Sequence, residues 1–152
     1  MKRICLHGPE STGKSTLATR LAAHFGCEVV PEYGRAYCEA HGTDIGMAEL
    51  VHIAEAQDAM NRAAAVRAAE LHAPLVLFDT DPLITAVWAE MMFGARDPWF
   101  DRFTGYADLY LLLDIDLPDG SGLDAVADVA AVASVVMISA HDDPSLVRRA
   151  MQ

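Results

Sequence analysis

Residues 8–15 read Gly8-Pro9-Glu10-Ser11-Thr12-Gly13-Lys14-Ser15 and match the pattern G-x-x-x-x-G-K-[ST]. The apolar run Ile4-Cys5-Leu6 precedes this stretch, and a helical pattern begins near Lys14. Glycines let such a turn fold back without Cβ clashes, so that successive backbone N–H groups and the N-terminus of the following helix face a phosphate group. The lysine then supplies a cation, and the serine hydroxyl supplies a Mg²⁺ ligand. The stretch therefore predicts a phosphate-binding loop and, with it, the binding of a nucleotide.

Apolar runs outside this loop predict an α/β fold. Five of them are typical of β-strands, at residues 3–6, 28–30, 75–78, 109–113 and 135–138. Helical patterns lie between and after them, at residues 14–25, 34–40, 47–71, 82–93, 123–132 and 144–151. Because these runs have the pattern of buried strands rather than alternating ones, they indicate a parallel sheet that is covered on both faces. Right-handed crossovers then give a three-layer α/β/α fold with ligands at the carboxyl ends of the strands.

Composition limits the class of protein. A chain of 152 residues that is 53% hydrophobic suits a single globular domain. Its formal net charge of −11 argues against a nucleic-acid partner, because no basic stripe is present to bind a phosphate backbone. The three cysteines form neither a metal-binding spacing nor an even disulfide set. The longest uncharged stretch, within residues 129–140, is too short to span a membrane. We therefore expect a soluble protein of the reducing cytoplasm, with no nucleic-acid or membrane partner.

The stretch Glu32-Tyr33-Gly34-Arg35 follows the second predicted strand. Its acid and its base are therefore expected at the sheet edge where the phosphate-binding loop opens. A carboxylate there can accept the proton of an attacking hydroxyl, and an arginine can bind the acceptor or neutralise charge on a phosphate. The spacing is equally compatible with a surface ion pair at the start of a helix.

The stretch Phe78-Asp79-Thr80-Asp81 closes the third predicted strand. An acid directly after a buried strand holds Mg²⁺ in P-loop enzymes, so Asp79 is the candidate residue for the metal. Asp81 is a candidate for binding substrate hydroxyls, but Asp81 followed by Pro82 also reads as a helix N-cap with proline at the first helical position. Trp88 and Trp99 belong to an apolar cluster that is expected in the core, with a substrate pocket as the alternative for either ring.

Together these motifs resemble the NadR-type ribosylnicotinamide kinase family. The resemblance covers residues 1–113 and includes Thr85, Trp88 and the strand Tyr110-Leu111-Leu112-Leu113-Asp114. It implies a P-loop kinase sheet of five strands in the order 2-3-1-4-5. It also implies that ATP, with Mg²⁺, phosphorylates the 5′-hydroxyl of nicotinamide riboside in NAD salvage.

The resemblance also implies roles for individual residues. Lys14, Glu32 and Asp79 would be catalytic, and Ser15 and Asp79 would bind the metal. The residues expected to hold ATP are Gly8, Glu10, Ser11, Thr12, Gly13, Lys14, Ser15 and Thr16. Those expected on the nucleoside side are Glu32, Arg35, Asp81 and Trp88.

From Asp114 onward the chain resembles the middle of a response-regulator receiver domain, over residues 114–123, 135–140 and 142–150. This second resemblance implies Asp114 as phosphoacceptor and Ser139 as switch hydroxyl. A receiver carries an acidic metal-binding pair after its first strand, where this chain has His7 and the phosphate-binding loop, so phosphorelay chemistry is not expected. We interpret the chain as one hybrid domain of residues 1–152, a kinase-like part of residues 1–113 completed by a receiver-like part of residues 114–152. Recombination by engineering is the favoured origin, with a natural fusion or a frame error as alternatives.

The hybrid interpretation bears on catalysis. In the kinase family a lid with arginine is expected after the fourth strand, but this chain has Asp119-Gly120-Ser121-Gly122 there. An arginine that stabilises the transferring phosphoryl group is worth about 10³-fold or more in rate. Three hypotheses follow: an ATP-binding and Mg²⁺-binding domain with impaired or no catalysis, an active nucleoside kinase, or a fold-recombination protein without a function. The sequence sets no oligomeric state.

Overall fold

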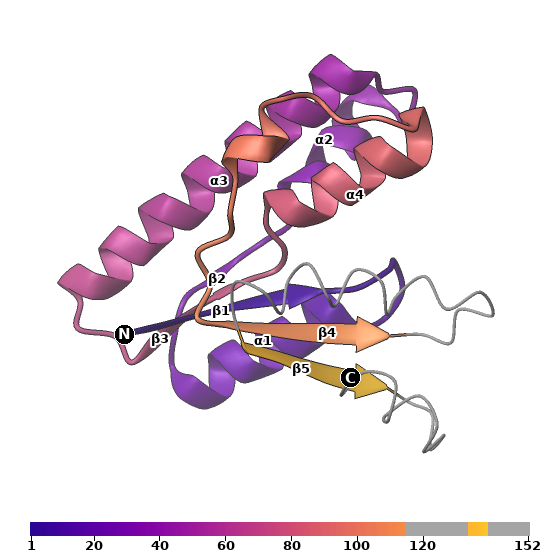
Figure 1. Ribbon diagram of the computed structural model, residues 1–152. Coiled ribbons are helices and arrows are strands. Elements are labelled where there is room, and N and C mark those ends of the chain that lie inside the picture. Colours follow the sequence, from indigo (N-terminus) through magenta and orange to yellow (C-terminus); the bar gives the residue numbers. More distant parts are fainter. Residues whose placement is uncertain (115–133, 140–152) are drawn as a thin grey trace.

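The computed structural model describes residues 1–114 and 134–139. Its centre is a parallel sheet of five strands in the order β2-β3-β1-β4-β5 (Figure 1). The strands are β1 (Lys2–His7), β2 (Val29–Val30), β3 (Leu75–Phe78), β4 (Leu109–Asp114) and β5 (Ser134–Ser139). The expected order 2-3-1-4-5 is confirmed, with the last strand pairing in parallel with the fourth.

Four α-helices and one short 3₁₀ helix connect the described strands. They are α1 (Lys14–Phe25), α2 (Tyr33–His41), α3 (Met47–Glu70), α4 (Pro82–Phe93) and η1 (Phe100–Arg102). The four α-helices agree with the predicted ones to within one residue at each end, whereas η1 was not predicted. The helices predicted at residues 123–132 and 144–151 lie outside the described residues.

The two faces of the sheet are covered by different helices, which makes three layers (Figure 1). Successive residues of a strand point to opposite faces. Leu75 and Leu77 accordingly pack with Ala18 of α1, while Val76 and Phe78 pack with alanines of α3 on the other side. Because each face of β3 is buried, the strand needs apolar residues at every position, which is why it reads as a continuous apolar run.

Local sequence signals set the ends of α4. Asp81 is its N-cap and accepts a hydrogen bond from the backbone N–H of Leu83, with Pro82 at the first turn. Gly94 ends the helix in the left-handed conformation, with φ +64°. The capping alternative for Asp81 is therefore confirmed.

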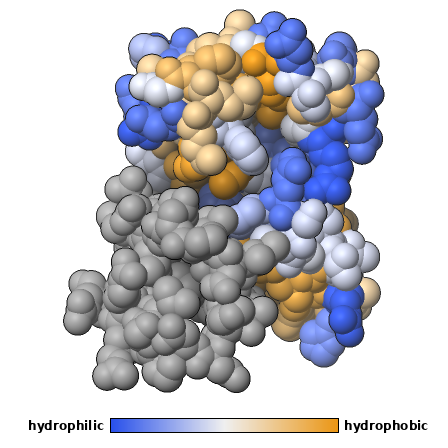
Figure 2. Space-filling model, turned by 90° about the vertical axis from the view of Figure 1, so that its right-hand side faces the viewer, coloured by the Kyte–Doolittle hydropathy of each residue, from blue (hydrophilic) through white to orange (hydrophobic). Residues whose placement is uncertain are grey.

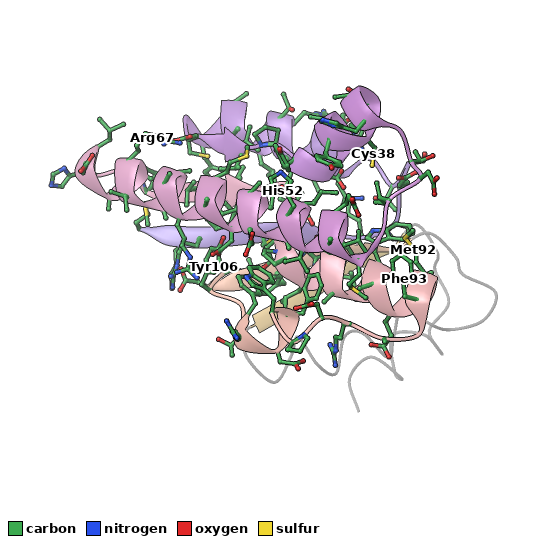
Figure 3. All side chains as sticks on the ribbon, turned by 90° about the horizontal axis from the view of Figure 1, so that it is seen from above. Cys38, His52, Arg67, Met92, Phe93 and Tyr106 are labelled. Atoms are coloured by element: carbon green, nitrogen blue, oxygen red, sulfur yellow. The ribbon has the colours of Figure 1, made fainter. Side chains whose placement is uncertain are left out.

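A separate apolar cluster fixes α4 against α3. It contains Leu50 and Ala54 of α3, Ala86 and Ala89 of α4, and Phe100 of η1. Trp99 packs against this cluster as part of the core and does not line the pocket described below. Seen from above, α3 crosses over the sheet, and Met92 and Phe93 mark the end of α4 (Figure 3). No helix among the described residues is long and apolar enough to cross a membrane.

Candidate functional site

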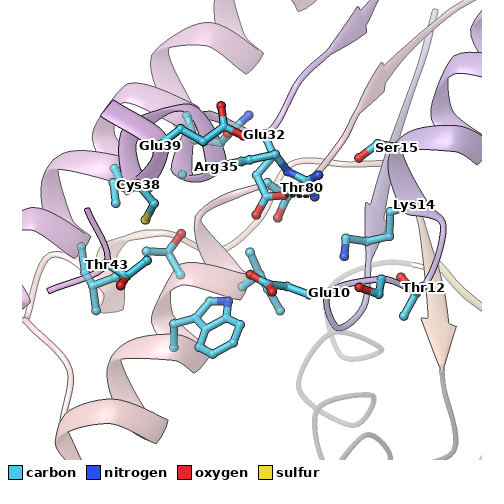
Figure 4. Close-up of a pocket in the computed structure, with 18 of the residues that line it drawn as sticks. Glu10, Thr12, Lys14, Ser15, Glu32, Arg35, Cys38, Glu39, Thr43 and Thr80 are labelled. Carbon is cyan, nitrogen blue, oxygen red and sulfur yellow. Dashed lines mark hydrogen bonds and ion pairs between the residues drawn. The ribbon is translucent and has the colours of Figure 1, made fainter. Parts of the chain in front are cut away.

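A pocket of about 770 Å³ opens at the carboxyl edge of the sheet. Figure 2 faces this edge, where hydrophilic and hydrophobic residues meet. One wall is the loop after β1, and the opposite wall comes from α2, α3 and α4 (Figure 4). Many predicted site residues line it: Glu10, Ser11, Thr12, Gly13, Lys14, Ser15, Thr16, Glu32, Arg35 and Trp88. Among the residues predicted for ATP, metal or nucleoside, Gly8, Asp79 and Asp81 do not line it.

The glycine that begins the loop is required by its surroundings. Gly8 has φ +145°, and a Cβ built on it would overlap the backbone oxygen of Leu113 at the end of β4. Ser11 and Gly13 also have positive φ values, of 63° and 82°. Alternation of left-handed and right-handed residues turns successive backbone N–H groups to one side, which produces an anion-binding concavity. The loop therefore has the backbone form that its sequence predicts.

Lys14 lies inside this loop. Its Nζ donates to the carbonyl oxygens of Gly8 and Pro9, at 2.7 Å and 2.6 Å. Burial lowers the pKa of the lysine below its ordinary value, while the nearby carboxylates of Glu32 and Asp79 act in the opposite direction. The amino group is thus a desolvated cation next to the pocket, where its attraction for an anion is less screened than in water.

Ser15 and Asp79 meet at the base of the loop. Ser15 Oγ donates to Asp79 Oδ2 at 2.6 Å. Asp79 is buried, and its other oxygen, Oδ1, has no hydrogen-bond partner among residues 1–114 and 134–139. A buried anionic oxygen without a donor is costly, and a hydroxyl with a carboxylate is an oxygen donor set that Mg²⁺ prefers. The pair therefore fits a hard cation.

Glu32 and Arg35 form an ion pair of 3.5 Å across the first turn of α2. Both side chains line the pocket, where Arg35 is more than half exposed and Glu32 about one quarter. The ion pair expected at the helix start is therefore present, and both residues also face the space in front of the loop (Figure 4).

Asp81 differs from the predicted substrate contact. The residue is fully buried, and its carboxylate accepts from Tyr110 Oη at 2.7 Å and from Leu83 N at 2.9 Å. His7 Nε2 lies 2.9 Å from the same carboxylate, and Cys5 Sγ completes a buried group whose donor atoms lie within 4.8 Å of one another. Both oxygens are thus engaged inside the protein and are not placed on the pocket wall.

Sequence reasoning missed a buried amide network that supports the site. Gln57 and Asn61 of α3 are almost fully buried, and Gln57 Nε2 donates to Asn61 Oδ1 at 3.0 Å. Gln57 also accepts from Tyr33 N, and Asn61 Nδ2 donates to the carbonyl oxygen of Thr80. The network ties the ends of β2 and β3 together. Two amides four residues apart on an otherwise Ala-rich helix face were the available signal.

The backbone also places the two receiver-like positions. Asp114 and Ser139 are register partners on β4 and β5, at the edge where β1 ends in the loop. This register shows only that the two strands lie side by side. The receiver-like origin of the segment stays a prediction.

Comparison with known proteins agrees with this geometry. A family model described as AAA domain matches residues 3–128, and no curated protein matches the chain significantly. A solved structure of NadR protein in complex with NR has a TM-score of 0.69 at 22% identity, covering 98% of this chain and 46% of that one. A structure of NadR protein in complex with NAD and AMP-PNP has a TM-score of 0.66 at 24% identity, covering 99% of this chain and 47% of that one.

Thymidylate kinase from Ehrlichia chaffeensis gives a TM-score of 0.63 at 14% identity, with 99% of this chain and 95% of that chain covered. At these identities the likenesses concern the fold, and the chain spans about half the length of the NadR chains. They establish a P-loop fold like that of nucleoside and nucleotide kinases. Since the family model covers most of the sequence, including the loop, Lys14 and Asp79, the chain belongs to the AAA domain family.

Proposed function

We propose that the protein binds ATP together with Mg²⁺, with the phosphates in the loop of residues 8–15. The contact between Ser15 and Asp79 beside the buried Lys14 carries this proposal, because it combines a cation, a metal-ligand pair and an anion-binding backbone. Bound Mg²⁺ would neutralise negative charge on the phosphates. Lys14 would bind a terminal phosphate oxygen, and the loop N–H groups would orient the phosphates.

We further propose nicotinamide riboside as the phosphoryl acceptor, in the part of the pocket between α2 and α4. The support is the resemblance of the sequence motifs to ribosylnicotinamide kinases and the likeness to a NadR structure with bound NR. Glu32 would accept the proton of the 5′-hydroxyl, Arg35 would hold the acceptor or neutralise phosphate charge, and Trp88 would contact the base. Asp81 stays buried and supports this region as the cap of α4.

Catalysis is proposed to be slow or absent. Between Arg102 and Arg148 the sequence contains no lysine or arginine, so the segment that would serve as a lid has no cation for the transferring phosphoryl group. Loss of such an arginine costs about 10³-fold or more in rate. The chain would therefore retain ATP binding while phosphoryl transfer is slow or absent.

Calorimetric titration with ATP and Mg²⁺ tests the proposal. Lys14→Ala should remove the binding heat, whereas Lys2→Ala, which changes the only other lysine of the chain, should leave it intact. Absence of saturation at millimolar ATP in the wild-type protein rejects the proposal. Equal thermal stability with and without nucleotide also rejects the proposal, since a ligand that binds only the native state must raise stability. That result favours a fold-recombination protein without a function.

The alternative is an active nucleoside kinase. It is favoured by the presence of Glu32 and Arg35 on the pocket wall opposite Lys14. Release of ADP that depends on the riboside and disappears in Lys14→Ala would establish it.

For residues 114–152 we propose a receiver-like origin, with the segment completing the sheet rather than taking part in phosphorelay. The support is the sequence pattern and the pairing of β5 with β4. The AAA domain match continues to residue 128 and so marks no boundary at residue 113. Incubation with acetyl phosphate followed by mass spectrometry should leave Asp114 unmodified, and a phosphorylated Asp114 would overturn this part of the proposal.

A further inference from the structure

Thr80 has a strained backbone at the edge of the pocket. Its φ is +100°, a value that a β-branched residue rarely adopts. Such conformations persist where the surrounding structure enforces them, and they are concentrated at functional sites. The residue stands directly between Asp79 and Asp81, in the turn that connects β3 to α4.

Buried partners enforce this conformation. Asn61 is fully buried, and its Nδ2 donates to the carbonyl oxygen of Thr80 at 3.0 Å. On the preceding side, the N–H of Asp79 donates to the carbonyl oxygen of Val30 at 2.8 Å. On the following side, Asp81 is held by its cap interactions with α4. The backbone of Thr80 is therefore held at its own carbonyl oxygen and at both neighbouring residues.

The hydroxyl of Thr80 has no hydrogen-bond partner in the described part of the chain. Oγ1 is buried, the residue is 4% exposed, and it lines the pocket. Thr80 shares the lining of this pocket with Glu32, Arg35 and Thr12 (Figure 4). A buried hydroxyl without a partner is unfavourable, so strain and desolvation are both maintained at a residue in the wall of the pocket.

We propose that Thr80 is a specificity residue whose hydroxyl hydrogen-bonds a hydroxyl group of the phosphoryl acceptor. The inference rests on the proposed function, since it assigns a contact in the same site. A hydroxyl both donates and accepts, so Oγ1 can pair with a sugar hydroxyl in either sense. Separate titrations with the riboside and with ATP distinguish a contact to the acceptor from one to the nucleotide.

Substitution by valine isolates the hydroxyl. Thr80→Val keeps the β-branched shape and removes Oγ1, whereas Thr80→Ser keeps Oγ1. Calorimetry with nicotinamide riboside should show about 10-fold weaker binding for Thr80→Val, the equivalent of one lost hydrogen bond, and about wild-type binding for Thr80→Ser. The Kd for ATP with Mg²⁺ should stay unchanged in both. Thr104→Val, at an exposed position after η1 that does not line the pocket, serves as the control for threonine replacement.

Thermal unfolding without ligand separates this role from a structural one. Removing a hydroxyl that has no partner should leave the Tm of Thr80→Val at or above that of the wild type. If Thr80→Val does not fold, Thr80→Ala removes the same hydroxyl and takes its place in the titrations. Unchanged riboside binding in a folded variant without the hydroxyl overturns the role of Thr80 alone. A wild-type protein that binds ATP but not the riboside overturns the acceptor assignment, and the role of Thr80 with it.

Discussion

The hydroxyl of Ser15 donates a hydrogen bond of 2.6 Å to Asp79, which joins the loop after β1 to the end of β3. The two residues are 64 positions apart in the sequence. They meet because β1 and β3 pair in parallel, with Cys5 opposite Phe78, so that both strands end at the same edge. The second carboxylate oxygen of Asp79 has no partner within the described residues, which leaves it free for a cation.

Asp79→Asn should reduce the magnesium dependence of ATP binding. The substitution keeps the shape but removes the negative charge that a hard cation requires. The ratio of ATP affinities with Mg²⁺ and with EDTA should fall by about 10-fold or more, the scale of one lost charged interaction. Asp108→Asn is the control, because Asp108 pairs with Arg3 before β4 begins, away from the pocket. The same ratio in Asp79→Asn as in the wild type would show that Asp79 is not a metal ligand.

Gly8→Ala should destabilise the fold far more than Gly26→Ala. Both glycines have positive φ, but a Cβ on Gly8 overlaps the backbone of Leu113, whereas a Cβ on Gly26 meets open space. We expect about 1–2 kcal/mol for Gly26→Ala from its left-handed conformation alone. Gly8→Ala should cost about 3 kcal/mol or more, since backbone atoms must move. Urea unfolding measures both, and equal midpoints would contradict the close approach of the loop to β4.

Tyr110→Phe should destabilise the protein at neutral pH. It removes the hydroxyl that donates to Asp81 at 2.7 Å and leaves a buried carboxylate oxygen with one donor fewer. The expected loss is about 1–3 kcal/mol in the free energy of unfolding. Tyr106 is the matched control, because its buried hydroxyl has no hydrogen-bond partner in the part of the chain described. Tyr106→Phe should change stability by less than about 1 kcal/mol, and similar losses in the two variants would refute the role of the Asp81 contact.

Stability should fall steeply above about pH 10, the pKa of an unfolded tyrosine. Burial, followed by the charge of Asp81, raises the pKa of Tyr110 in the folded protein above that value. Above pH 10 the unfolded chain therefore binds fewer protons than the folded one, so the free energy of unfolding decreases as pH rises, while below pH 10 this contribution is constant. Urea midpoints between pH 8 and pH 11 should decline less in Tyr110→Phe. Parallel declines would show that Tyr110 does not carry this pH dependence.

Much of the fold could be predicted because its signals are local. The loop of residues 8–15, the strands and the capping alternative for Asp81-Pro82 each depend on neighbours in sequence, and the structure contains all of them. The short 3₁₀ helix η1 was missed because three residues carry no periodicity. The helices predicted after β4 and β5 fall outside the described residues.

The candidate site was only partly accessible from sequence. Lys14, Ser15 and Asp79 follow from motif position. Gln57 and Asn61 do not, since an amide on a helix usually lies in water, and the positive φ of Thr80 has no signal in the sequence. The roles of the two amides depend on burial, which α3 acquires by packing against the sheet, and that of Thr80 depends on its backbone conformation in the turn between β3 and α4. The two interpretations of Asp81 could not be separated by spacing, because the deciding partners, His7 and Tyr110, come from other strands.

The sequence by itself determined the phosphate-binding loop and the apolar strands. Both depend on residues that are neighbours in sequence: glycines set the backbone conformation of the loop, and runs of apolar residues indicate strands buried on two faces. Tertiary structure alone decided which polar side chains line the pocket and which form hydrogen bonds to other residues inside the protein. The physical reason is that a hydroxyl, amide or carboxylate has the same chemistry at every position. Its availability to a ligand depends on the donors and acceptors that distant segments bring to it, as Tyr110 does for Asp81 and as no described residue does for the hydroxyl of Thr80.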